Sequence, residues 1–257
     1  MIHSPSSQIS VDPERPSEVA RRLRCVLLTT DTKHHRYFAN RMAQRADLTV
    51  ILEPERPHHP KPPQRFLDMQ EDFEDHFFGE AIPSSFSGHQ VLCEVEPVNG
   101  PACIGRISDL KPDLLIAFGT GRLLPQLFGQ GRLSLNVHRG ILPNYRGLDS
   151  DLWAFYFGDF ENVGTTLHQM ESRLDTGPIL WQKRLKIQRG CEPHQLRYST
   201  TLLAAEGMGE ICDRLERGVP LRATPQDLSK GRYFSIIPPL KRRIALWRFS
   251  RYVRRLR

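Results

Sequence analysis

Residues 134–180 read SLNVHRGILPNYRGLDSDLWAFYFGDFENVGTTLHQMESRLDTGPIL, and this stretch contains the main signals for fold and chemistry. Asn136 and His138 stand two residues apart in a pattern typical of a strand, so both side chains point to the same face. Turn residues, an aromatic helix and a second strand separate this pair from Asp175, which lies in a tight loop. An amide, an imidazole and a carboxylate at one point suit acyl transfer between nitrogens.

The segments before this stretch predict a parallel sheet. Residues 24–30 and 48–52 are apolar and strand-like, and the helical pattern of residues 35–46 lies between them, as in a βαβ unit. Residues 113–118 form an unbroken apolar run of the kind buried in parallel sheets. Ligands bind beyond the carboxyl ends of such strands, where residues 119–125 fall.

We divide the chain into three parts. Residues 1–22 are rich in Ser, Pro and charge and predict a flexible N-terminal lead. Residues 23–190 predict one catalytic domain, with a mostly parallel, Rossmann-like α/β sheet and helices on both faces. Residues 191–257 predict a short C-terminal extension, formed by a long helix at residues 192–217, an extended segment and a basic tail.

Charge and composition exclude some classes of protein. The net charge of +7 comes from the tail at residues 241–257, which has eight Lys or Arg and no acid. The rest of the chain has the other 28 of the 36 basic residues and all 29 acidic residues, so it is nearly neutral. No apolar run reaches the roughly 18 residues that a membrane-spanning helix needs, and the five cysteines show no spacing typical of disulfide pairs. We therefore expect a cytoplasmic protein.

The basic tail has several readings. We favour an amphipathic helix in which Ile244, Trp247 and Val253 pack on the domain or on a second subunit, which makes a homodimer plausible. Contact with an anionic membrane surface is a weaker alternative, and a nucleic-acid site is weaker still because no reading motif accompanies the charge. The adjacent pairs His34–His35 and His58–His59 do not predict a metal site, since neighbouring side chains diverge and no third ligand stands nearby.

Three motifs in order resemble the folate-dependent formyltransferase family over residues 113–180. They are N-x-H-x-x-x-L-P-x-Y-R-G from Asn136, G-x-T-x-H from Gly164 and D-T-G-x-I-L from Asp175. The resemblance implies that Asn136, His138 and Asp175 are catalytic. It also implies that N10-formyltetrahydrofolate is the formyl donor and that no metal takes part.

The resemblance also assigns the binding residues. The segment TGRLLP at residues 120–125 is similar to the one that holds the pterin ring in the family. Donor-binding residues are therefore expected to be Gly121, Arg122, Leu123, Leu124, Thr176 and Gly177. Acceptor-binding residues are expected to be His34, Tyr37, Tyr145, Arg146 and His168, although His168 could equally serve a structural role.

The acceptor is approached by elimination within the family. The position of the glycine-rich phosphate loop of glycinamide ribonucleotide transformylases reads TTDTKHHRYF, without glycine. We also expect neither the tRNA-gripping C-terminal barrel of methionyl-tRNA formyltransferases, because only 77 residues follow Leu180, nor the regulatory domain of the hydrolases. The chain most resembles the sugar N-formyltransferases, which act on nucleotide-linked amino deoxysugars.

Two alternatives stay open. One is formylation of an amino-acid or peptide amine in secondary metabolism. The other, from a different class, is a non-catalytic folate- or nucleotide-binding module, although such a protein would not need Asn136, His138 and Asp175 together.

Overall fold

The computed structural model describes residues 8–9, 22–53, 62–82, 85–86, 90–93 and 98–256. Its centre is a seven-stranded sheet with the order β4-β3-β2-β5-β6-β8-β9. The first five strands in this order run parallel, and β8 and β9 extend the sheet antiparallel. The bounds are β2 Leu23–Thr29, β3 Ala46–Leu52, β4 Gln90–Cys93, β5 Leu114–Phe118, β6 Leu133–His138, β8 Gly164–Gln169 and β9 Ile179–Arg184.

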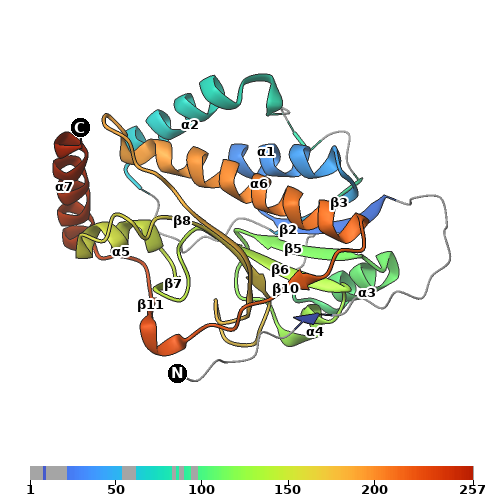
Figure 1. Ribbon diagram of the computed structural model, residues 1–257. Helices are drawn as coiled ribbons and strands as arrows, with labels where there is room; N and C mark the ends of the chain where they lie inside the picture. The colour runs from blue at the N-terminus through green and yellow to red at the C-terminus, as the bar shows by residue number, and fades with distance from the viewer. Residues whose placement is uncertain are drawn as a thin grey trace.

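Helices cover both faces of this sheet (Figure 1). One face is covered by α1 (Lys33–Ala43) and α6 (Leu196–Glu216), and the other by α3 (Pro101–Leu110) and α4 (Pro125–Phe128). The helix α2 (Gln64–Phe78) packs outside α1 and α6. The predicted α/β fold with a mostly parallel, Rossmann-like sheet is therefore confirmed.

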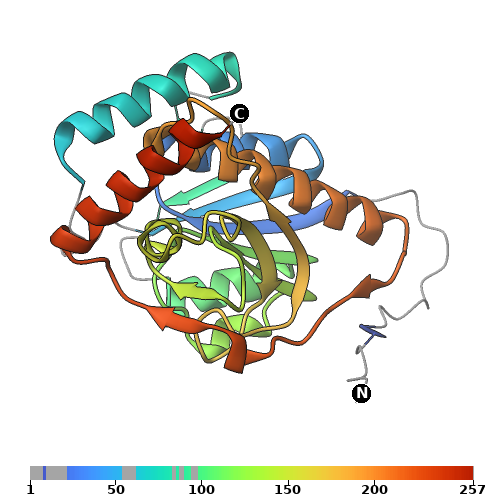
Figure 2. The same cartoon turned by 60° about the vertical axis from the view of Figure 1, so that its left-hand side comes forward.

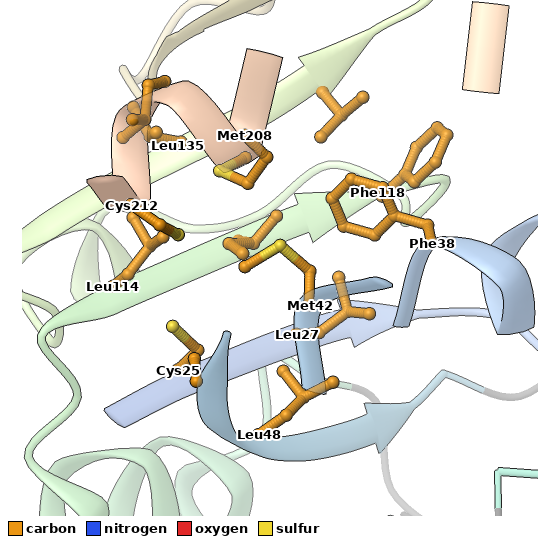
Figure 3. Close-up of a cluster of buried hydrophobic side chains, with 14 of the residues drawn as sticks. Cys25, Leu27, Phe38, Met42, Leu48, Leu114, Phe118, Leu135, Met208 and Cys212 are labelled. Atoms are coloured by element: carbon orange, nitrogen blue, oxygen red, sulfur yellow. The ribbon is translucent and has the colours of Figure 1, made fainter. Parts of the chain in front are cut away.

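The core between α1, α6 and the sheet explains why these segments are helical. The α6 residues Ala204, Met208 and Cys212 recur every four positions and are buried, as an amphipathic helix requires. Figure 3 shows Met208 of α6 above Met42 of α1, and Cys212 beside Leu114 of the sheet, within one buried cluster. Although we assigned α6 to the C-terminal extension, it thus packs in the core of the sheet domain. The boundary at residue 190 stays a prediction.

Several elements begin or end a few residues away from their predicted bounds. The helix predicted from residue 192 starts at Leu196, because Pro193–Gln195 forms a 3-10 turn closed by a capping box between Glu192 and Gln195. The other two 3-10 turns among the described residues are η1 Gly79–Ala81 and η3 Leu228–Lys230. The pair His58–His59 lies outside the described residues.

The last part of the chain wraps around the catalytic motif. The strand β11 (Arg232–Phe234) pairs parallel with β7 (Tyr145–Gly147), which carries the Y-R-G triplet. Beyond it, α7 (Pro239–Arg255) packs against α5 (Ser150–Phe157), beside which it stands in Figures 1 and 2. The C-terminal segment therefore reaches the loop that follows Asn136 and His138.

One face of the basic tail packs into a hydrophobic cluster of the domain. In α7, Ala245, Phe249 and Val253 are buried, and the Phe249 ring lies 4.3 Å from the Phe155 ring between centroids. Val253 packs on the domain, as predicted, whereas Trp247 is 56% exposed and does not, so its packing on a second subunit stays a prediction. The helical period places Ala245, Phe249 and Val253 on the packed face and turns Trp247 away from it.

Two further features concern the N-terminus and membranes. Gln8–Ile9 forms β1, which pairs antiparallel with β10 (Leu221–Arg222); the rest of the predicted N-terminal lead, apart from Arg22, lies outside the described residues. Within the described parts of the chain, no helix has the length and apolar character needed to span a membrane.

Candidate active site

Asn136, His138 and Asp175 meet at the carboxyl end of the sheet. The first two side chains project from one face of β6, and Asp175 reaches them from the loop between β8 and β9. His138 Nδ1 lies 3.6 Å from Asp175 Oδ2, and Asn136 Nδ2 donates to Asp175 Oδ1 at 3.3 Å. The spacing of Asn136 and His138 and the D-T-G loop therefore produce the cluster that the sequence predicts.

The imidazole of His138 is buried and fixed in one tautomer. Its Nε2–H donates to the carbonyl oxygen of Tyr145 at 2.8 Å, which leaves the Nδ1 lone pair toward Asp175. Burial lowers the pKa of His138 below 6.5; the charge of Asp175 opposes this shift and that of His168 adds to it. The lowered pKa favours the neutral form of His138 in the resting protein.

Asp175 stays ionised in spite of its burial. Its side chain is only 11% exposed, and burial alone would raise its pKa. The neighbouring His138 and His168 and the Gly147 N–H, which donates to Oδ2 at 2.7 Å, instead hold the pKa of Asp175 well below its usual range. Asp175 also has a φ of 55°, a strained conformation for a residue with a side chain and one that clusters at functional sites.

The loop that carries Asp175 is held by the C-terminal segment. Gln226 Nε2 donates to the carbonyl oxygens of Asp175 at 3.2 Å and of Gly177 at 2.6 Å. A Cβ at Gly177 would lie 2.0 Å from the Gln169 carbonyl oxygen, so only glycine fits there. Gly177 thus allows the loop to approach β8, and its predicted contact with the donor stays a prediction.

His168 orients the Asn136 amide. Its Nδ1–H donates to the Gln169 carbonyl oxygen at 2.8 Å, so Nε2 accepts from Asn136 Nδ2 at 3.0 Å. The same Nε2 lies 3.4 Å from Asp175 Oδ1. In the resting site, both contacts of the Asn136 amino group are therefore to His168 and Asp175, and a substrate oxygen must replace one of them.

A cavity of about 960 Å³ opens over these residues. It is lined by the loops after β2, β3 and β5 and by the β8–β9 loop. The predicted site residues that line it are Asn136, His138, His168, Asp175, Gly121, Arg122 and Leu123. The cavity thus combines Asn136, His138 and Asp175 with half of the predicted donor residues.

Other predicted residues lie elsewhere. Leu124 and Gly177 do not line this cavity, and Thr176 and Arg146 line a smaller adjoining pocket. His34 is buried against His35 and Phe118, and Tyr37 stacks on Phe78 with ring centroids 4.1 Å apart, so neither reaches the cavity.

Tyr145 supports the site from behind. Its hydroxyl donates to Asp159 Oδ2 at 2.9 Å, and its ring stacks on Phe234. Its carbonyl oxygen fixes the tautomer of His138. Tyr145 therefore fixes His138 from outside the large cavity, and its predicted contact with the acceptor stays a prediction.

Sequence reasoning missed Glu53 and Tyr233. Glu53 Oε2 accepts from the Gly121 N–H at 2.9 Å and orders the loop predicted to hold the donor. The only signal for Glu53 is its position just after a buried strand. Tyr233 lies in β11 and is 53% exposed at the cavity wall. No local sequence pattern predicts that it lines the cavity. Among the described residues, no group of three His, Cys, Asp or Glu side chains is placed to hold a metal ion.

The tautomer and burial of His138 predict its titration. By NMR of the ring protons, His138 should titrate below its ordinary value of 6.5, so its neutral form persists until the pH falls through that lowered value. Asp175→Asn should lower the pKa of His138 further, because the carboxylate favours the charged imidazole. The exposed His76 is the control and should not respond to Asp175→Asn. A midpoint at or above 6.5 for His138 in the parent protein would refute the neutral resting state.

The comparisons with solved structures agree with this architecture. A likely sugar N-formyltransferase from Mycobacterium tuberculosis aligns with a TM-score of 0.57 and 19% identity, covering 83% of this chain and 75% of that one. A sugar N-formyltransferase from a Shewanella species aligns with a TM-score of 0.55 and 16% identity, covering 88% and 87%. At these identities the likeness shows a shared fold.

A third structure and a sequence relative add to this. The formyltransferase PseJ from Anoxybacillus kamchatkensis, solved with UDP-4,6-dideoxy-4-formamido-L-AltNAc and tetrahydrofolate, aligns with a TM-score of 0.50 and 19% identity, covering 82% of this chain and 86% of that one. The methionyl-tRNA formyltransferase of Geobacter metallireducens is 32% identical over 138 residues, which span 53% of this chain and only 44% of that relative.

The family comparison covers most of the chain. Residues 54–210 match the formyl transferase family, and they include the Asn136–His138 pair, the Y-R-G triplet and the Asp175 loop. The matched segment also contains β5, β6, β8 and β9, whose ends form the cavity. This chain therefore belongs to the formyl transferase family.

Proposed function

We propose that the protein transfers a formyl group from N10-formyltetrahydrofolate to the primary amine of a nucleotide-linked amino deoxysugar. The observation that carries the proposal is the cluster of Asn136, neutral His138 and ionised Asp175 at the base of a 960 Å³ cavity. Pockets for small substrates typically measure 300–1,000 Å³. Sugar N-formyltransferases and PseJ, solved with a formamido nucleotide sugar and tetrahydrofolate, support this substrate class by their common fold.

The donor supplies an activated formyl carbon, and the residues of this chain handle the charge and the proton. The acceptor amine attacks that carbon and its C–N bond forms as the bond to N10 of the donor breaks. The amide Nδ2 of Asn136 stabilises the oxygen that gains negative charge, after exchanging one of its present contacts. His138 Nδ1 takes the proton that the amine loses and returns it to N10, so the reaction ends with a formamide and tetrahydrofolate.

Asp175 stabilises the charged intermediate state of His138. In the resting site its Oδ2 faces the Nδ1 lone pair at 3.6 Å, and protonation of Nδ1 turns this contact into an ion pair. Tyr145 keeps accepting from Nε2 in both states, so the ring stays in place while Nδ1 gains and loses its proton. This makes His138 a general base whose conjugate acid is formed only during the reaction.

A spectrophotometric assay of tetrahydrofolate release tests the proposal. N10-formyltetrahydrofolate is supplied with a panel of amino-sugar nucleotides that differ in nucleotide and amine position, with glycinamide ribonucleotide, with free amino acids, or with buffer alone. We expect tetrahydrofolate release that depends on one amino-sugar nucleotide. Mass spectrometry should find about 28 Da added to that acceptor, because a formyl group replaces one amine hydrogen.

The other outcomes of this assay are equally informative. Release of tetrahydrofolate at the same rate with buffer alone would identify a hydrolase and would reject the proposed amino-sugar acceptor. Release with an amino acid only would move the activity to the amino-acid alternative. Donor binding without release under any condition would favour a non-catalytic binding module and contradict the catalytic cluster.

A further inference from the structure

A second pocket of about 250 Å³ adjoins the large cavity. It is lined by Arg122, Arg146, Ser172, Arg173, Leu174, Thr176 and Tyr233. Three of these residues, Arg122, Leu174 and Tyr233, also line the large cavity, so the two spaces share a wall. Among the described residues, the lining itself holds three guanidinium groups, three hydroxyl groups and no carboxylate, and the Glu171 carboxylate approaches one of the hydroxyls, that of Thr176, at 3.4 Å. Such a set is complementary to an anion.

Arg146 gives this pocket an unusual buried charge. The residue is only 7% exposed, and its Nη2 donates to the Gly231 carbonyl oxygen at 3.1 Å. Its Nε and Nη1 are buried and have no hydrogen-bond partner among the described residues. A buried cation without a counter-charge is costly, since its field is poorly screened in the protein interior. An anion in the adjoining pocket would compensate that charge.

We propose that this second pocket is a subsite for an oxyanion group, carboxylate or phosphate, of a substrate whose reactive part lies in the large cavity. Arg122 and Arg173, which are exposed at the pocket, present N–H donors to the oxyanion, and Arg146 adds its buried positive charge from the floor. The inference rests on the proposed function, because it assigns the charged end of one of the two proposed substrates.

The walls favour the donor as the source of the oxyanion. Arg122 follows Gly121 in the loop after β5, and Thr176 follows Asp175 in the β8–β9 loop, so both walls continue segments predicted to hold the donor. The donor ends in glutamyl carboxylates, whereas the acceptor carries phosphates. The loops after β2 and β3, with Thr32 and Glu53, line the large cavity but not the second pocket and leave room for the acceptor.

The subsite also connects to the catalytic loop. Thr176 Oγ1 donates to the Arg173 carbonyl oxygen at 3.0 Å, within the turn that sets the position of Asp175. Gly147, next to Arg146, donates its N–H to Asp175 Oδ2. An oxyanion bound between Arg146 and Arg173 therefore touches both segments that hold the catalytic carboxylate.

Calorimetric binding to the full-length protein tests the subsite. The variants are Arg122→Gln and Arg173→Gln, since both side chains are exposed and the fold does not depend on them. Arg217→Gln, after the end of α6, is the matched control because Arg217 is exposed and lines neither pocket. The probes are tetrahydrofolate, tetrahydropteroate, which lacks the glutamate, and the nucleoside diphosphates UDP and dTDP.

We expect Arg173→Gln and Arg122→Gln each to weaken tetrahydrofolate binding about tenfold or more, as loss of a charge-assisted hydrogen bond does. Tetrahydropteroate should bind the parent protein and both variants equally. Weakened UDP or dTDP binding with unchanged tetrahydrofolate binding would keep the oxyanion subsite but assign it to the phosphates of the acceptor.

Two results would overturn the proposal. Equal binding of every probe to Arg122→Gln, Arg173→Gln and Arg217→Gln would reject the subsite while leaving the proposed function intact. If the parent protein binds neither tetrahydrofolate nor a nucleotide, the proposed function fails and the subsite fails with it.

Discussion

Replacing His138 by alanine should lower the turnover number for formyl transfer by about 100- to 10,000-fold, the usual contribution of a general base. The change removes the Nδ1 lone pair that faces Asp175 Oδ2 at 3.6 Å and leaves the developing ammonium without a proton acceptor. It also leaves the Tyr145 carbonyl oxygen without the Nε2–H donor, although the Ser150 hydroxyl donates to the same oxygen at 3.2 Å. Steady-state kinetics measures the loss.

The control for this variant separates chemistry from folding. His138→Ala should keep its circular dichroism spectrum, and it should bind tetrahydrofolate within a few-fold of the parent protein, because His138 supplies only a small part of the cavity wall. His76→Ala, at an exposed histidine on α2, should keep full activity. Near-normal turnover of His138→Ala would disprove the mechanism. If His138→Ala fails to fold, His138 is needed for the structure and the loss of activity says nothing of catalysis.

Replacing Glu74 by alanine should lower the free energy of unfolding by about 3–5 kcal/mol, the range seen when one partner of a buried ion pair is removed. The Glu74 side chain on α2 is fully buried, and its two oxygens accept from Arg197 Nε at 2.6 Å and Nη2 at 2.8 Å. Arg197 lies on α6, so the pair joins the outer helix to the helix that covers the sheet. Without Glu74, the guanidinium stays buried and unpaired.

Urea denaturation of three variants tests this interpretation. Glu71→Ala, on the same helix but exposed, should cost about 0.5 kcal/mol or less, since its ion pair with Lys33 is solvent-exposed. The double variant Glu74→Met, Arg197→Met should recover much of the loss, because neither charge is then left alone. A Glu74→Ala effect as small as that of Glu71→Ala would show that water reaches Arg197 freely.

The sequence predicts those parts of the molecule that depend on short-range pattern. The apolar run at residues 113–118 predicts the buried parallel strand β5, and the two-residue spacing of Asn136 and His138 predicts their common face on β6. The D-T-G turn predicts where an acid approaches this pair. Each of these features is encoded within a few neighbouring residues.

The features that the sequence did not predict depend on contacts between distant segments. The protonation state of His138 follows from its burial and from the Tyr145 carbonyl oxygen, neither of which a motif reveals. The many basic residues at 241–257 made it hard to predict from the sequence that Ala245 and Phe249 are buried. Tyr233 reaches the cavity because β11 pairs with β7, nearly ninety positions earlier in the chain.

The pairing of β11 with β7, together with Gln226, has a consequence for how the protein is made. The ribosome synthesises Asn136, His138 and Asp175 well before the residues that hold their loops, Gln226 and Arg232–Phe234. Because domains fold as units once their contacting segments have emerged, a nascent chain can form the sheet but not the finished catalytic loop. The loop that carries Asp175 should therefore reach its final position only after Gln226 and Arg232–Phe234 have emerged from the ribosome.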